Sequence, residues 1–136
     1  MILNFDLIAP VYDFLAKLIY GHSIREAQSC YLHHIKSFSS VLILGGGTGW
    51  ILDELSSINN DISVDYVEAS SKMLTISKNR GIHSFTSLNF ILGTELVVEN
   101  NSYDFILTPF VLDVFPIGEL GQMVNRVKKL LSSDGE

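Results

Sequence analysis

The chain has 136 residues, of which 47% are hydrophobic and 18% are charged, and its formal net charge is −6. This length and composition predict a single globular domain and exclude a disordered chain. The acidic balance argues against nucleic acid and anionic membranes as partners, because both require a basic surface. One cysteine excludes an internal disulfide, and no stretch reaches the roughly 18 apolar residues of a membrane helix. We therefore expect a cytoplasmic protein.

The N-terminal part of the chain predicts two helices. Residues 4–36 carry apolar side chains at helical spacing, with a break near residue 21. Ser23 and, three residues later, Glu26 form a capping box, which is typical of the start of a second helix. On the buried face of this second helix we expect Ile24, Ala27, Tyr31 and His34. Residues 1–37 are thus predicted to form a helical lid on a core that spans residues 38–136.

An apolar run ends in a glycine cluster at the start of the predicted core. The residues from Val41 to Leu44 are all apolar and two are β-branched, which is typical of a strand buried on both faces. Glycines follow at positions 45, 46, 47 and 49, and apolar spacing from Trp50 onwards predicts a helix. A strand, a glycine turn and a helix in this order form a place where an α/β fold lets a ligand contact the backbone.

The rest of the chain alternates between predicted strands and predicted helices. Further strands are expected at residues 62–67, 88–92 and 103–108, and a loop is expected at residues 56–61. Further helices are expected from Ser70 or Ser71 to about Lys78 and from Ile117 to Leu131. Because strands that alternate with helices connect through right-handed crossovers, we predict an α/β fold with a Rossmann-like, doubly wound parallel sheet.

Two nucleotide-binding motifs can be excluded for the glycine turn. A phosphate-binding P-loop needs a lysine after its glycines, but Trp50 and Ile51 follow Gly49. A dinucleotide motif needs its third glycine where Trp50 stands. Glu68 ends the next predicted strand, where a carboxylate can accept hydrogen bonds from both hydroxyls of a ribose and has little structural use. These residues predict a nucleoside site and leave the cofactor open.

Five stretches of the chain, in order, resemble the motifs of class I S-adenosylmethionine-dependent methyltransferases. They are VLILGGGTG, VEASSKML, NFILGTEL, NSYDFILTPFVLDVF and RVKKLLSSDGE. The N-terminal stretch NFDLIAPVYD is similar to the first helix of the quinone-biosynthesis type and of other small-molecule methyltransferases. The resemblance implies a Rossmann-like core, S-adenosylmethionine as cofactor, no metal, and transfer of a methyl group to a small-molecule acceptor.

The resemblance also implies roles for individual residues. The backbone of Gly45, Gly46, Gly47, Thr48 and Gly49 would contact the methionine part and the ribose, and Glu68 would bind the ribose hydroxyls. The adenine would lie against Ala69, Met73, Thr94 and Glu95. The methyl-transfer pocket would be lined by Thr108, Pro109, Phe110 and Val111, and Tyr12 would close over the methionine end. Where the acceptor must lose a proton, the candidate bases are Asp113, His22 and Tyr12, and Tyr20 and Asp13 could also serve by residue type.

Three features depart from the pattern of this family. Ile43 stands where an acid usually helps to hold the amino group of the cofactor, and Thr94 stands where an aspartate usually meets the adenine. The sheet of the family also continues through a fifth strand and a hairpin, which residues 1–136 do not include, so the core is expected to be truncated. We therefore expect Phe105, Ile106 and Leu107 to form an exposed apolar edge through which the chain self-associates.

Two other functions stay open at this point. A nicotinamide-dependent oxidoreductase uses a similar fold and a similar acid on its ribose, and Trp50 in place of a glycine is the feature that counts against it. A module that binds a nucleoside or another protein without catalysis is compatible with Ile43, Thr94 and the shorter sheet.

Overall fold

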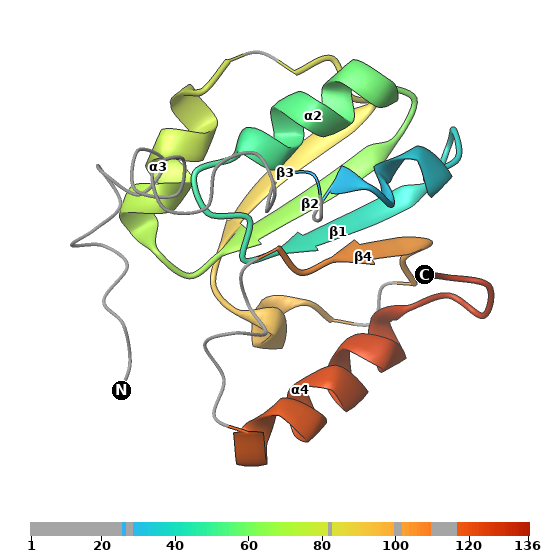
Figure 1. Ribbon diagram of the computed structural model, residues 1–136. Helices are drawn as coiled ribbons and strands as arrows, with labels where there is room; N and C mark the ends of the chain where they lie inside the picture. The colour runs from blue at the N-terminus through green and yellow to red at the C-terminus, as the bar shows by residue number, and fades with distance from the viewer. Residues whose placement is uncertain (1–25, 27–28, 82, 100–101, 110–116) are drawn as a thin grey trace.

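The computed structural model describes residues 26, 29–81, 83–99, 102–109 and 117–136. In this part of the chain four parallel strands form one sheet in the order β3-β2-β1-β4. The strands are β1 (Ser40–Leu44), β2 (Ser63–Glu68), β3 (Ser87–Leu92) and β4 (Phe105–Leu107). The helices are η1 (Leu32–His34), α2 (Trp50–Ile58), α3 (Ser71–Asn79), η2 (Glu95–Val97) and α4 (Ile117–Leu130). Figure 1 shows α2 and α3 on one side of the sheet and α4 on the other, which confirms the predicted doubly wound α/β fold.

The strand β1 lies at the centre of the sheet and is buried on both faces, as its apolar run predicts. Val41 and Ile43 belong to the core under α2 and α3, whereas Leu42 and Leu44 belong to the core under α4. This division follows from the strand, in which successive side chains point to opposite faces. The chain leaves β1 towards β2 on one side, and β4 lies on the other side of β1. The carboxyl end of β1 is therefore a topological switch point, which is where open α/β sheets bind ligands.

Several predicted element bounds differ from the structure by one to three residues. The helix α2 extends to Ile58, so the loop after it begins at Asn59 rather than at residue 56. The strand β4 is shorter than predicted and α4 ends at Leu130, because Tyr103 and Leu131 pair with each other in an isolated parallel bridge. The late start of β4 and the early end of α4 both arise from tertiary hydrogen bonds, which the local sequence pattern does not predict.

The predicted N-terminal lid lies almost entirely outside the described residues. Where the structure describes this region, Glu26 and Ser29 are α-helical and the Cys30 N–H donates to the Glu26 carbonyl at 3.0 Å, whereas Leu32–His34 form the short 3-10 helix η1. Tyr31 is 62% exposed and His34 is also exposed, so the predicted burial of these two side chains was wrong. The tighter 3-10 winding turns Leu32 and Ile35 inward in their place, where both pack in the core under α2.

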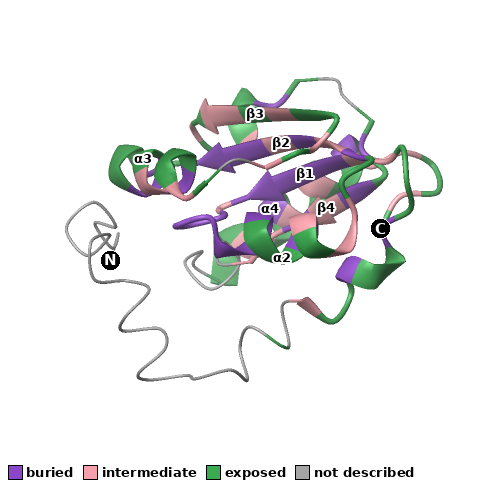
Figure 2. Cartoon of the chain, turned by 90° about the horizontal axis from the view of Figure 1, so that it is seen from above, coloured by how far each residue is buried: buried purple, intermediate pink, exposed green. Residues whose placement is uncertain are grey.

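The prediction that the side chains of β4 are exposed was wrong. Phe105 and Leu107 are buried under α2, and Ile106 packs against the core under α4. In Figure 2 the neighbouring strands β1 and β2 are coloured mainly as buried. On the outer side of β4 the Ile106 N–H donates to the Glu136 carbonyl at 2.8 Å, and the Glu136 N–H donates to the Asp104 carbonyl at 3.0 Å. Self-association through this edge stays a prediction.

The helix α4 covers the second face of the sheet with one apolar stripe. Its buried residues are Met123 and Leu130, and Val127 packs against the same core. Glycines and charged or amide side chains occupy much of the opposite side. None of the helices in the described part of the chain is long and apolar enough to cross a membrane.

Candidate nucleoside site at the carboxyl ends of the strands

The glycine turn after β1 has a backbone conformation that requires glycine. Gly45, Gly47 and Gly49 have positive φ angles of 65°, 66° and 90°, a region that side chains with a Cβ rarely adopt. The Gly45 N–H donates to the Val67 carbonyl at 2.8 Å, which keeps the start of the turn on the sheet. Gly49 is the N-cap of α2 and provides no side-chain cap. The turn therefore brings bare backbone to the switch point between β1 and β4.

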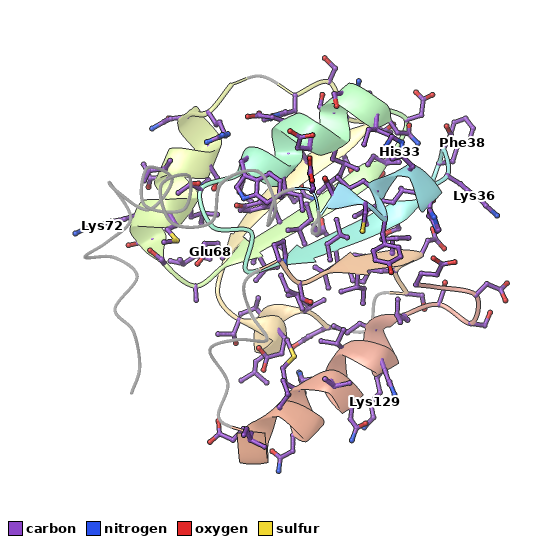
Figure 3. All side chains as sticks on the ribbon, in the orientation of Figure 1. His33, Lys36, Phe38, Glu68, Lys72 and Lys129 are labelled. Carbon is purple, nitrogen blue, oxygen red and sulfur yellow. The ribbon has the colours of Figure 1, made fainter. Side chains whose placement is uncertain are left out.

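Glu68 holds the glycine turn from the neighbouring strand. The Gly47 N–H donates to one carboxylate oxygen of Glu68, Oε2, at 2.9 Å, and the Ser70 N–H donates to the other oxygen, Oε1, at 2.9 Å. Glu68 is only 6% exposed, and Figure 3 labels it beside the turn that leaves β1. The expectation that this acid has little structural use was wrong, because it joins the ends of β1 and β2. Hydrogen bonds to a charged acceptor are roughly twice as strong as neutral ones.

Two buried hydroxyl groups hold the same turn from beneath. The Tyr66 hydroxyl lies 2.9 Å from the Gly47 carbonyl oxygen, and the Ser77 hydroxyl lies 2.8 Å from it. The two hydroxyl oxygens are 3.0 Å apart, and the Ser77 hydroxyl also lies 2.9 Å from the Met73 carbonyl. Tyr66 and Ser77 are both fully buried. The Gly47 N–H and the Gly47 carbonyl are thus both bonded to side chains of the core.

At Gly46 and Gly49, close packing also leaves no room for a side chain. A Cβ on Gly46 would overlap the aromatic ring of Tyr66, and a Cβ on Gly49 would lie 3.0 Å from the Cβ of Ser77. The small residue that lets α2 approach its neighbours is therefore Gly49, one position before Trp50. Trp50 itself is 3% exposed and packs in the core under α2 and α3.

The residues expected to face the adenine lie at the carboxyl ends of β2 and β3. Met73 is buried in the first turn of α3, which Ser70 caps by accepting a hydrogen bond from the Met73 N–H at 3.2 Å. Ala69 is exposed. Thr94 is exposed and caps η2, because its Oγ1 accepts from the Leu96 N–H at 3.3 Å, and Glu95 follows it in a half-buried position. These residues share the edge of the sheet that carries the glycine turn.

The described part of the chain contains only some of the residues expected in the methyl-transfer pocket. Thr108 and Pro109 follow β4 directly and are half-buried. Phe110, Val111, Asp113, Tyr12 and His22 lie outside the described residues. Among the residues that the structure describes, no group of three or more His, Cys, Asp or Glu side chains is arranged to hold a metal ion.

Sequence reasoning missed Tyr66 and Ser77. A signal for Tyr66 was present, because it precedes Glu68 by two residues in the same strand and must point to the same face of the sheet. No local pattern identifies Ser77, which reaches the turn only because α3 packs next to it.

A family model described as a methyltransferase domain matches residues 41–135. No curated protein gives a significant match.

Among solved structures, the DhpI-SAM-HEP complex is 19% identical with a TM-score of 0.77, covering 96% of this chain and 59% of the other. The plantazolicin methyltransferase BamL, solved with a triazolic desmethylPZN analogue and SAH, is 21% identical with a TM-score of 0.64, covering 93% of this chain and 52% of the other. The mitomycin 7-O-methyltransferase MmcR is 14% identical with a TM-score of 0.69, covering 98% and 41%. The chain thus spans between two fifths and three fifths of the length of these three structures.

Proposed function

The chain belongs to the methyltransferase domain family, and we propose that it binds S-adenosylmethionine and transfers its methyl group to a small-molecule acceptor. The observation that carries this proposal is the buried Glu68 carboxylate, bonded to the Gly47 N–H of a turn with three positive φ angles. That arrangement places an acceptor for ribose hydroxyls next to backbone that a ligand can approach closely.

The chemistry of the site fits a nucleoside with a free ribose diol. Each Glu68 oxygen accepts one backbone N–H, and a carboxylate oxygen can accept two hydrogen bonds. Acceptor capacity therefore remains on both oxygens for the two hydroxyls. A 2′-phosphate would be repelled by the same carboxylate. The four glycines expected beside the cofactor's methionine part and ribose carry no side chain that would block its approach.

The residues of the chain would act mainly by binding and orientation. Bound S-adenosylmethionine would supply an activated methyl group on a sulfonium, whose thioether leaving group needs no acid. Glu68 and the turn would hold the ribose, and Met73 and Thr94 would lie along the adenine. Holding donor and acceptor in line can lower the barrier by about 7–11 kcal/mol. Where the acceptor carries a proton, Asp113, His22 or Tyr12 would accept it.

The small-molecule class of the acceptor is part of this proposal. BamL and MmcR are named as methyltransferases of plantazolicin and mitomycin, and their folds resemble this chain. The acidic net charge of −6 also disfavours a nucleic-acid acceptor. A cytoplasmic location is proposed on the single cysteine of the chain, which fits a reducing compartment.

The ribose assignment of Glu68 is tested by pairing a protein change with a ligand change. Glu68→Ala removes the acceptor but also loosens the turn, so weaker binding alone is not decisive. We therefore compare S-adenosylhomocysteine with its 2′-deoxy analogue by calorimetry on wild type and on Glu68→Ala. Wild type should prefer the hydroxylated ligand by about ten- to hundredfold, since a hydrogen bond to a charged group contributes roughly 1.5–3 kcal/mol. In Glu68→Ala this preference should nearly vanish.

The matched control is Glu54→Ala, which removes an exposed carboxylate from α2. It should keep the full preference for the hydroxylated ligand. An equal preference in wild type and Glu68→Ala would refute the ribose role, and absence of binding by wild type would refute the proposed function as a whole.

Self-association through the outer edge of β4 is proposed as a separate property. β4 ends the described sheet, and its three residues have a strand partner only on the side of β1. The hydrogen bonds to Glu136 occupy part of the outer edge. Sedimentation at micromolar concentration should show a species larger than the monomer, and a sharp monomer would contradict this.

A further inference from the structure

We propose that Tyr66 and Ser77 are positioning residues for cofactor binding, which hold the Gly47 carbonyl so that the glycine turn has its ligand-binding shape before a ligand arrives. The inference rests on the proposed function, and it assigns to two hydroxyl groups a role that goes beyond packing. Both residues lie beneath the turn and are fully buried, so neither is expected to touch the cofactor itself.

The hydrogen bonds act on two successive peptide units around one flexible residue. Glu68 accepts from the N–H of Gly47, which belongs to the peptide between Gly46 and Gly47. Tyr66 and Ser77 bond to the carbonyl of Gly47, which belongs to the next peptide. When the planes of two successive peptides are fixed, φ and ψ of the residue between them are fixed too. Gly47 is thereby held at its positive φ of 66°.

A glycine needs this support more than other residues. Glycine loses the most conformational freedom when it becomes ordered. If the turn were ordered only by the cofactor, that loss would be subtracted from the binding free energy. Because the hydroxyls of Tyr66 and Ser77 hold the turn in the folded protein, the turn is already ordered before the cofactor binds.

Either of the two hydroxyls can donate a hydrogen bond to the Gly47 carbonyl. Each hydroxyl has one proton, and the acceptors that the described contacts offer include the Gly47 carbonyl, the Met73 carbonyl and the other hydroxyl. One arrangement has Tyr66 donating to Ser77 and Ser77 donating to Gly47. Another has Tyr66 donating to Gly47 and Ser77 donating to Met73. Either residue alone can therefore bond Gly47, and removal of both is needed to release it.

The protein contains a matched control for Tyr66. Tyr103 is also buried, and its hydroxyl donates to Asp65 Oδ2 at 2.6 Å. Tyr103 packs in the core under α4, on the face of the sheet opposite to Tyr66 and the turn. Tyr66→Phe and Tyr103→Phe thus remove the same group from equally buried positions, and only Tyr66→Phe removes it from the turn.

The test is the affinity for S-adenosylhomocysteine of Tyr66→Phe, Ser77→Ala, the double variant and Tyr103→Phe. We expect each single variant at the turn to weaken binding by about threefold and the double variant by about tenfold or more, from the usual strength of a buried hydrogen bond. Tyr103→Phe should bind within about twofold of wild type even though its thermal stability falls, because the bond that it loses joins Tyr103 to the Asp65 carboxylate and not to the turn.

A second measurement needs no ligand. Amide hydrogen exchange of Gly47 and Gly49 in the free protein should be faster in the double variant than in Tyr103→Phe, when both are compared at equal global stability. If wild type binds no S-adenosylhomocysteine, the proposed function fails and exchange alone decides whether the hydroxyls order the turn. If wild type binds but the double variant matches Tyr103→Phe in affinity and in exchange, the inference fails while the proposed function stands.

Discussion

The two halves of the candidate site are built in different ways. At the ends of β1 and β2, Glu68, Tyr66 and Ser77 are buried and hydrogen-bonded to the turn. At the end of β3, Thr94 is exposed and bonds only within its own short helix η2, and Leu92 and Leu96 nearby are 55% and 62% exposed. The first half is therefore ordered by the fold. The second half lies at the surface, where a bound ligand would contact exposed side chains.

This difference predicts where substitutions act on the fold and where they act on the ligand alone. Changes beneath the turn should lower stability and affinity together, because the same bonds serve both. Changes at η2 should leave stability nearly unaltered.

Among changes to the residues of the turn itself, the largest effect is expected for Gly46→Ala. The new Cβ would overlap the ring of Tyr66, and overpacking of a core typically costs roughly 1–3 kcal/mol, with this direct overlap at the upper end. Chemical denaturation measures the loss. The control is Gly121→Ala in the exposed part of α4, where a Cβ meets nothing within 4 Å and should stabilise the helix by about 1 kcal/mol. Equal effects of the two changes would contradict the packing described here.

The origin of that effect is isolated by combining Gly46→Ala with Tyr66→Ala. Tyr66→Ala alone removes a fully buried ring and should cost about 3–5 kcal/mol. In that background the alanine at position 46 has room, so its additional cost should fall below about 1 kcal/mol. Additive effects in the double variant would show that Gly46 is required for a reason other than the Tyr66 ring.

A smaller effect is expected for Asp53→Ala. Asp53 joins α2 to the end of α3 through Arg80 Nε at 2.6 Å, and it also bonds His83 Nε2 at 2.7 Å. Its side chain is 47% exposed, so we expect a loss of about 1 kcal/mol or less. Affinity for S-adenosylhomocysteine should not change. A loss of affinity as large as that of the double variant at Tyr66 and Ser77 would mean that the helix positions, and not the hydroxyls, order the turn.

The smallest effect on stability is expected for Thr94→Ala. The change removes the cap of the three-residue helix η2, which should cost a few tenths of a kcal/mol at this exposed end. If Thr94 contacts the adenine as proposed, affinity should fall by about two- to fivefold, which corresponds to a weak neutral hydrogen bond. Thr75→Ala, an exposed change in α3, serves as the control for affinity.

The fold could be predicted from sequence because its signals are local. The apolar run before Gly45 marks β1, and the glycines followed by Trp50 mark the turn and α2. The predicted end of α4 and the predicted start of β4 were wrong because the bridge between Tyr103 and Leu131 joins segments that are distant in the sequence. Local periodicity contains no information on such a pairing.

The backbone of the candidate site could be predicted from the sequence, but the side-chain hydrogen bonds that hold the turn could not. Glu68 could be placed beside the turn because the ends of adjacent parallel strands meet at one edge of the sheet. Its bonds to Gly47 and Ser70 could not, because they depend on the side-chain rotamer in the folded protein. Ser77 is an ordinary helix residue by sequence, and only the packing of α3 against Gly49 gives it a role.

If the turn and Glu68 bind the nucleoside of S-adenosylmethionine, the chain must discriminate between nucleoside cofactors. Calorimetric titration of the wild-type chain with S-adenosylhomocysteine and, under the same conditions, with NAD measures this discrimination. We expect saturable binding of S-adenosylhomocysteine with a one-to-one stoichiometry and no binding of NAD. Saturable binding of NAD with no response to S-adenosylhomocysteine would contradict this expectation.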